Sequence, residues 1–186
     1  MEILSSEKTS AARERILQTA QTLFYRDGIR ATGVDRIIAE ASVTKTTFYR
    51  HFKSKNNLII AYLERRDKNL LSSLSQSLVE NGGNVGAIIL TFKEWFESDS
   101  FRGCAFLNSV GEVGEIMPEV IEMTQRHKQG IADMLETVLP ESDHRPEVAM
   151  TLAMAIDGAT VRAQYDQDSK SAVQFLETIV RSVVGS

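Results

Sequence analysis

The stretch that decides the fold spans residues 34–58 and reads VDRIIAEASVTKTTFYRHFKSKNNL. It contains two short helical patterns, at 34–41 and 45–52, which meet at a tight turn. Thr44 precedes the second pattern, and its hydroxyl is suited to cap a helix N-terminus. The sequence therefore predicts two short helices joined by a turn.

The second of these helices has one apolar face and one polar face. Phe48 and Phe52 are four residues apart and fall on the same side, where they pack against the first helix. A helix-turn-helix, whose second helix enters the major groove of DNA, has this layout. The polar face and its flanks present Thr46, Thr47, Tyr49, Arg50 and His51.

The segments on either side continue the helical pattern. A helix from Ser10 ends at Asp27-Gly28, where glycine suits a left-handed cap. Thr32 or Gly33, just before the first short helix, is placed to offer a backbone N–H to a phosphate. Ser54 is suited to cap a long helix over 55–79.

The remainder of the chain predicts a helical body. After a break at 81–84, which contains two glycines, helical patterns cover 85–97, 105–114, 118–138, 147–165 and 171–184. The predicted fold is all-α with about nine helices. Residues 1–54 form the helix-turn-helix domain and residues 55–186 the body, which helix 55–79 connects to it.

Charge is divided unevenly along the 186 residues. Residues 1–60 contain ten Lys or Arg and six Asp or Glu, whereas residues 61–186 contain eleven and nineteen. The chain carries a net charge of −4 in total, but its first third is positive. This is the charge distribution expected where the first third contacts phosphates.

Several functional classes find no support in the sequence. The longest apolar runs are too short for a membrane span, and the N-terminus lacks a signal-peptide pattern. A single cysteine, Cys104, cannot form an internal disulfide, which favours a cytoplasmic location. Three histidines and one cysteine without ligand spacing predict no metal site, and we expect no cofactor and no enzymatic activity.

Residues 12–60 resemble the N-terminal DNA-binding domain of TetR-family transcriptional regulators. The most specific part is TTFYRHFKSK at 46–55, within a match that begins at ILQTAQTLF. A second segment, FRGCAFLNSVGEV at 101–113, is similar to one in the C-terminal domain of a TetR subgroup. Two positions depart from the family pattern, because Ile38 stands where alanine is common and Ser42 where glycine is common.

The resemblance assigns roles on the DNA. Residues at the start of the second helix are placed to read bases, and three further residues to contact phosphates. The alternative interpretations are core packing for Tyr49 and a solvated charge for Arg50. Base readers are Lys45, Thr46 and Thr47; phosphate contacts are Tyr49, His51 and Lys55; and Thr32, Arg36, Thr44 and Arg50 complete the predicted DNA-binding set.

The resemblance also implies a homodimer, built as a four-helix bundle from the last two helices of each chain. Two recognition helices about one DNA turn apart, roughly 34 Å, predict a palindromic operator on double-stranded DNA. The predicted interface residues are Val148, Leu152, Ile156, Ala159, Phe175, Leu176, Ile179 and Val183.

Finally, the family implies a small-molecule effector that binds the body and releases a repressor from its operator. The simpler interpretation of each pocket candidate is plain core, and for His127 a hydrogen-bonded buried histidine. The candidates are Tyr62, Trp95, Phe96, Cys104, Phe106, Met123, His127 and Met154.

Other functions remain open at this point. Arg102 and the following helix N-terminus favour a reactive thiolate at Cys104, which would make the chain an electrophile-responsive regulator. The simpler interpretation is a buried small side chain. A helical enzyme and an interaction adaptor that has lost DNA binding are weaker alternatives, because the DNA-contacting residues are intact.

Overall fold

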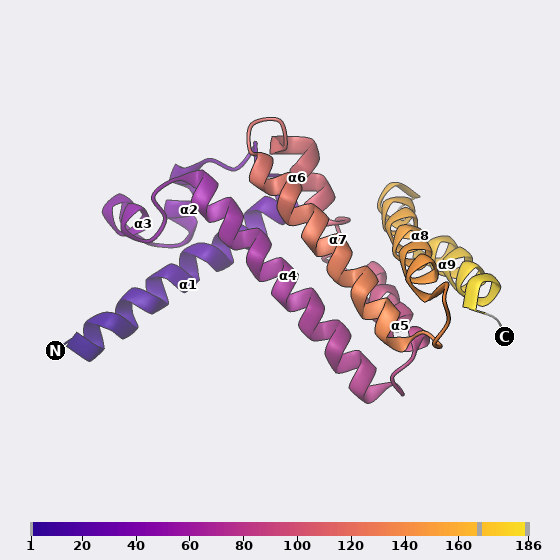
Figure 1. The fold of residues 1–186 in the computed structure, drawn as a ribbon. Helices are drawn as coiled ribbons and strands as arrows, with labels where there is room; N and C mark the ends of the chain where they lie inside the picture. Colours follow the sequence, from indigo (N-terminus) through magenta and orange to yellow (C-terminus); the bar gives the residue numbers. More distant parts are fainter. Residues whose placement is uncertain (1, 167–168, 185–186) are drawn as a thin grey trace. The chain divides into compact units, whose positions relative to one another are not determined.

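The computed structural model describes residues 2–166 and 169–184, and for residues 2–10 the backbone alone. These residues form nine helices and no strand (Figure 1). The predicted all-α fold is confirmed.

The first four helices contain the decisive stretch. α1 starts eight residues before the predicted Ser10, because residues 2–9 include neither proline nor glycine to stop a helix. α1 ends at Gly28, which adopts φ +92° and donates its N–H to the Phe24 carbonyl at 3.1 Å. The bounds are α1 Glu2–Asp27, α2 Val34–Glu40, α3 Lys45–His51 and α4 Lys55–Glu80.

The last five helices follow a glycine turn in which Gly82 and Gly83 have positive φ. Asn84 caps the next helix by accepting the Ala87 N–H at 3.3 Å. The fourth helix of this group begins two residues earlier than predicted, because Pro146 fits a first helical turn, where no backbone donor is needed. The bounds are α5 Val85–Glu97, α6 Ala105–Val113, α7 Pro118–Val138, α8 Arg145–Asp166 and α9 Ser169–Val184.

The chain divides into two compact units. The head unit comprises residues 1–66 and 105–123, and the body unit comprises 67–104 and 124–186. α4 is one continuous helix and contributes to both units, while α6 belongs to the head unit. The compact units therefore do not follow the expected boundary at residue 54. The division into a DNA-binding domain and a ligand-binding and dimerisation domain at that residue stays a prediction.

The core of the head unit holds α1, α2, α3 and α4 together. Ile16, Ile37 and Phe48 are fully buried, and Phe52 is only 2% exposed. Phe24 of α1 packs edge-on against Tyr62 of α4, with ring centres 5.6 Å apart. The apolar face predicted for α3 is thus the face that packs inward.

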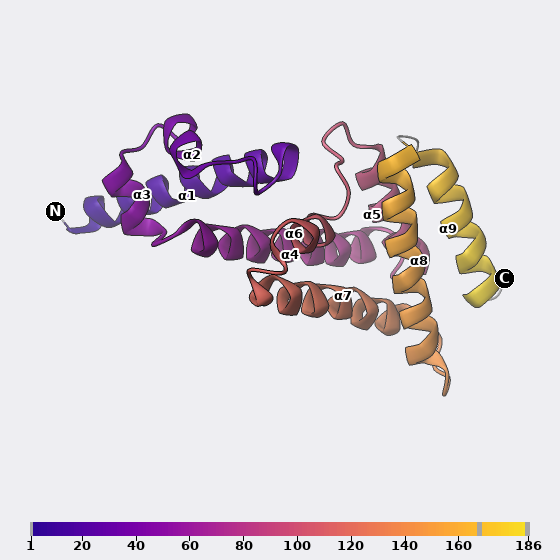
Figure 2. The same cartoon turned by 90° about the horizontal axis from the view of Figure 1, so that it is seen from above.

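The body unit has a separate core, in which α5 packs against α8 and α9. Ile88 and Phe92 of α5 are buried with Leu152 of α8 and Leu176 of α9. Figures 1 and 2 agree in placing α8 and α9 side by side. Within the described part of the chain, none of the helices has the length and apolar character needed to span a membrane.

Candidate DNA-binding surface

The turn before α3 has a defined hydrogen-bond pattern. Ser42 adopts φ +52° and donates its N–H to the Ala39 carbonyl at 3.1 Å. The next residue, Val43, donates its N–H to the Ile38 carbonyl at 3.2 Å. These are the two bonds of a Schellman motif, which satisfies the free carbonyls at a helix C-terminus. Both residues that depart from the family pattern, Ile38 and Ser42, therefore belong to one helix-ending motif.

The N-terminus of α3 is capped as the sequence predicts. Thr44 Oγ1 accepts the backbone N–H of Thr47 at 3.1 Å and lies 2.9 Å from the Thr47 hydroxyl. The cap fixes the direction in which α3 leaves the turn. It also engages Thr44 and Thr47 with each other, which leaves Thr46 and Lys45 as the more accessible predicted base readers.

Lys45 and Tyr49 project from the helix surface. Lys45 is 67% exposed and forms only a long ion pair with Asp35, at 3.6 Å. Tyr49 is 44% exposed, although its ring also packs edge-on against Phe48 with centres 5.2 Å apart. Tyr49 is thus compatible with both core packing and a phosphate contact, because one side of its ring packs against Phe48 while the rest of the side chain remains accessible.

His51 lies at the C-terminal end of α3 in a cationic environment. Its Nε2 atom is buried without a hydrogen-bond partner. Burial lowers the pKa of His51, and the Arg50 and Arg13 guanidinium groups lower it further. The guanidinium of Arg13, in α1, lies 5.1 Å from the centre of the Phe52 ring. No motif in the sequence marks Arg13 as part of this surface. An anion here would be attracted by the Arg13 and Arg50 guanidinium groups and would favour the protonated form of His51.

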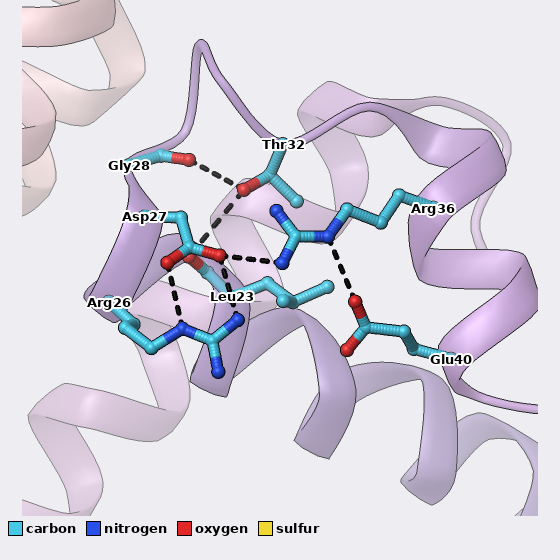
Figure 3. Close-up of polar contacts among 7 residues, drawn as sticks. All are labelled: Leu23, Arg26, Asp27, Gly28, Thr32, Arg36 and Glu40. Atoms are coloured by element: carbon cyan, nitrogen blue, oxygen red, sulfur yellow. Dashed lines mark hydrogen bonds and ion pairs between the residues drawn. The ribbon is translucent and has the colours of Figure 1, made fainter.

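A polar network ties the end of α1 to α2 (Figure 3). Asp27 accepts from Arg26 at 2.7 Å and pairs with Arg36 at 2.7 Å, while Arg36 Nε also donates to Glu40 at 2.8 Å. The two arginines, Arg26 first, lower the pKa of Asp27 to about 2. The charge of Arg36 is therefore balanced internally, and its contact with DNA stays a prediction.

Thr32 lies inside the protein, so its DNA contact stays a prediction that this geometry does not favour. Its side chain is fully buried, and its hydroxyl donates to the Gly28 carbonyl at 2.7 Å (Figure 3). Its N–H donates to the Ile29 carbonyl at 3.3 Å. Neither polar group is available to a phosphate. Thr32 instead stabilises the loop between α1 and α2.

Lys55 begins α4 and is directed to the protein's own backbone. Its Nζ donates to the Ile29 carbonyl at 2.5 Å. Burial lowers the pKa of Lys55, and the nearby Glu112 carboxylate acts in the opposite direction. The predicted phosphate contact is thus held internally on the Ile29 carbonyl, near Glu112, a residue of α6 that the sequence analysis did not identify.

The predicted ligand-binding residues are distributed over both units. Met154 is 68% exposed on α8, so its place in a ligand pocket stays a prediction. The body unit has a groove of about 410 Å³ between α5 and α9, which other residues line. Tyr62, Phe106 and Met123 are buried in the head unit. In the body unit Phe96, Cys104 and His127 are buried, and Trp95 is half-buried.

Two of these residues have defined surroundings. His127 Nδ1 lies 2.7 Å from Asp67 Oδ1, as expected for a hydrogen-bonded buried histidine. Cys104 is 5% exposed, and Arg102 donates to the loop carbonyls of Asp99 and Phe101. A reactive thiolate at Cys104 stays a prediction.

Half of the predicted dimer residues lie inside the body unit. Leu152, Ile156, Ala159 and Leu176 are at most 8% exposed and belong to its core, so they offer little surface to a second chain. Phe175 and Ile179 are exposed, whereas Val148 and Val183 are half-buried. The apolar side chains that α8 exposes are Met150, Met154, Val161 and Tyr165.

Known proteins match this chain in both sequence and fold. The profile of bacterial regulatory proteins of the tetR family matches residues 16–62, from the second half of α1 through α2 and α3 to the start of α4. The HTH-type transcriptional activator FasR of Mycolicibacterium smegmatis is 28% identical over 171 residues, 87% of this chain and 78% of the relative. The HTH-type transcriptional repressor NemR of Escherichia coli is 25% identical over 68% of this chain and 66% of its own length.

The structural match covers nearly the whole chain. The crystal structure of SCO4454, a TetR-family transcriptional regulator from Streptomyces coelicolor, has a TM-score of 0.83 and 33% identity, over 94% of this chain and 97% of that one. These relatives are transcriptional regulators rather than enzymes, as predicted. The chain therefore belongs to the TetR family of DNA-binding transcriptional regulators.

Proposed function

We propose that the protein is a homodimeric repressor that binds a palindromic operator and leaves it when a small molecule binds the body. The observation that carries the DNA-binding part is the capped α3, which buries Phe48 and exposes Lys45, Thr46 and Tyr49. A rigid helix with an accessible polar N-terminal half is the form in which helix-turn-helix proteins read bases.

Dimerisation is supported by the exposed apolar face of α8 and α9. Met154 and Phe175 are 68% and 58% exposed, and exposed apolar side chains that gather on one face are typical of an interaction site. Met150, Met154, Val161 and Tyr165 follow helical spacing along one side of α8. Two copies joined through this face would form a four-helix bundle.

Repression is the mode that needs the fewest additional features. The names of the relatives point both ways, since FasR is named an activator and NemR a repressor. A dimer that occupies an operator can block transcription without contacting polymerase. We accordingly propose repression, in the cytoplasm where a bacterial chromosome lies.

Release by a ligand requires two conformations with different affinities for DNA. α4 is a candidate for the element that differs, because it starts at the predicted phosphate contact Lys55 and extends to Glu80 in the body unit. A ligand that binds one conformation better would shift the equilibrium only by that difference in affinity.

The proposed DNA surface is tested with double-stranded DNA that the wild-type protein selects from a random library. Lys45→Ala should relax preference at one base position, at a cost of ~1–3 kcal/mol there. Tyr49→Ala should weaken binding to all sequences alike. Lys68→Ala, which removes an exposed cation of α4 in the body unit, is the matched control and should bind as the wild type does. Unchanged affinity and base preference in both α3 variants would reject this surface.

A further inference from the structure

Glu112, near the C-terminal end of α6, contacts the loop that joins α1 to α2. Its Oε2 atom accepts the backbone N–H of Arg30 at 2.8 Å. The same carboxylate lies over Gly28, where a Cβ atom would come within 3.0 Å of Oε2. The contact therefore depends on Gly28 both for its positive φ and for the absence of a side chain.

Lys55 binds the other end of the same peptide group. Its Nζ donates to the carbonyl of Ile29, and that carbonyl shares one peptide bond with the N–H of Arg30. A hydrogen bond accepted from the N–H polarises a peptide and makes its carbonyl a better acceptor. Glu112 thus strengthens the hydrogen bond that holds Lys55, although α6 and the start of α4 are far apart in sequence.

The two charges also interact directly. The Glu112 carboxylate is near enough to raise the pKa of Lys55 against the lowering caused by burial, which means that it stabilises the ammonium in its internal position. A DNA phosphate would attract the same ammonium and would be repelled by Glu112. Glu112 and a phosphate therefore compete for Lys55.

We propose that Glu112 is a positioning residue that restrains Lys55 on the Ile29 carbonyl and so limits the operator affinity of the head unit. The inference rests on the proposed function, in which Lys55 contacts a phosphate. It adds a control residue on α6, because any change at Glu112 alters how readily Lys55 leaves the loop for DNA.

A double-mutant cycle between Glu112 and Lys55 tests the proposal on the library-selected DNA. Glu112→Gln keeps the side-chain shape and an acceptor for the Arg30 N–H but removes the charge. We expect Glu112→Gln to bind about three- to tenfold more tightly than the wild type, as typical for coupled neighbours. Lys55→Met should bind more weakly, and adding Glu112→Gln to it should give no gain. Affinities are compared at low salt, where the Lys55→Met protein retains measurable binding.

The matched control is Glu115→Gln, which removes an exposed carboxylate three residues along the chain. It should leave affinity unchanged. The Arg30 amide proton reports the contact without DNA, and its NMR shift should move in Glu112→Gln but not in Glu115→Gln. Equal effects of the two substitutions, or a gain that persists beside Lys55→Met, would overturn the proposal.

The outcomes separate this inference from the proposed function. A wild-type protein that selects no DNA sequence would reject both. A wild-type protein that selects DNA while Lys55→Met binds equally well would reject the restraint alone and leave the proposed function intact.

Discussion

At the scale of single residues, Ser42 has an unfavourable backbone conformation for a residue with a side chain. It has φ +52° in the described part of the chain, where the remaining positive φ values belong to glycines. A left-handed conformation costs a residue with a Cβ roughly 1–2 kcal/mol, which the two Schellman hydrogen bonds offset. The turn is thus held by backbone bonds rather than by the preference of its residue.

Ser42→Gly is expected to stabilise the protein. Relief of the native strain should exceed the added flexibility of the unfolded chain, for a net gain of ~0.5–1 kcal/mol. Urea unfolding gives the free energy of unfolding directly. Ser72→Gly, in the interior of α4, is the control and should have the opposite sign. A destabilised Ser42→Gly protein would show that the serine side chain itself supports the turn.

Residue-scale predictions from the sequence succeeded where the partner is near in the chain. Thr44 caps α3 and Ser54 caps α4, each through a backbone N–H three residues ahead. They did not extend to contacts whose partner comes from elsewhere in the fold. Glu112 contacts Arg30 from 82 residues away. Spacing along the sequence contains no information about such contacts.

At the scale of elements, α8 shows why a helix can be predicted more easily than its orientation. Apolar residues occur on several sides of α8, so the sequence allows more than one stripe to face a partner. The stripe with Leu152 and Ile156 packs inside the body unit, and the stripe with Met150 and Met154 faces outward. Only the packing of α5 and α9 decides between them.

The outward stripe leads to a prediction about assembly. Met154→Glu should place a charge in the proposed four-helix bundle, and burial of an unpaired charge should raise the dimer dissociation constant at least about a hundredfold. Light scattering coupled to size-exclusion chromatography measures the mass. Val79→Glu, at an 83% exposed residue of α4, should not change it. A Met154→Glu protein that keeps the mass of the wild type would move the interface elsewhere.

At the scale of the whole molecule, charge is separated along the chain. The protein is acidic in total, at −4, yet its first 60 residues are basic. DNA binding should therefore depend on salt through the head alone. Each phosphate contact contributes about −0.9 to the slope of log affinity against log salt.

Arg50→Ala tests this separation and decides between a phosphate contact and a solvated charge at this residue. Loss of a contact in each head should reduce the slope by about 0.9 per head. Arg126→Ala removes an exposed arginine of α7 in the body unit and should leave the slope unchanged. Equal slopes for all three proteins would assign Arg50 to solvent.

The head unit has a consequence for engineering regulators by recombination. It consists of residues 1–66 together with 105–123, and Glu112 in the second segment holds the loop between α1 and α2. A chimaera that exchanges only the N-terminal residues would bring a foreign loop against the resident Glu112. A transfer of operator specificity should therefore exchange both segments. At the least, Gly28, Arg30, Lys55 and Glu112 should come from the same protein, so that the transferred loop keeps its contacts with Glu112 and Lys55.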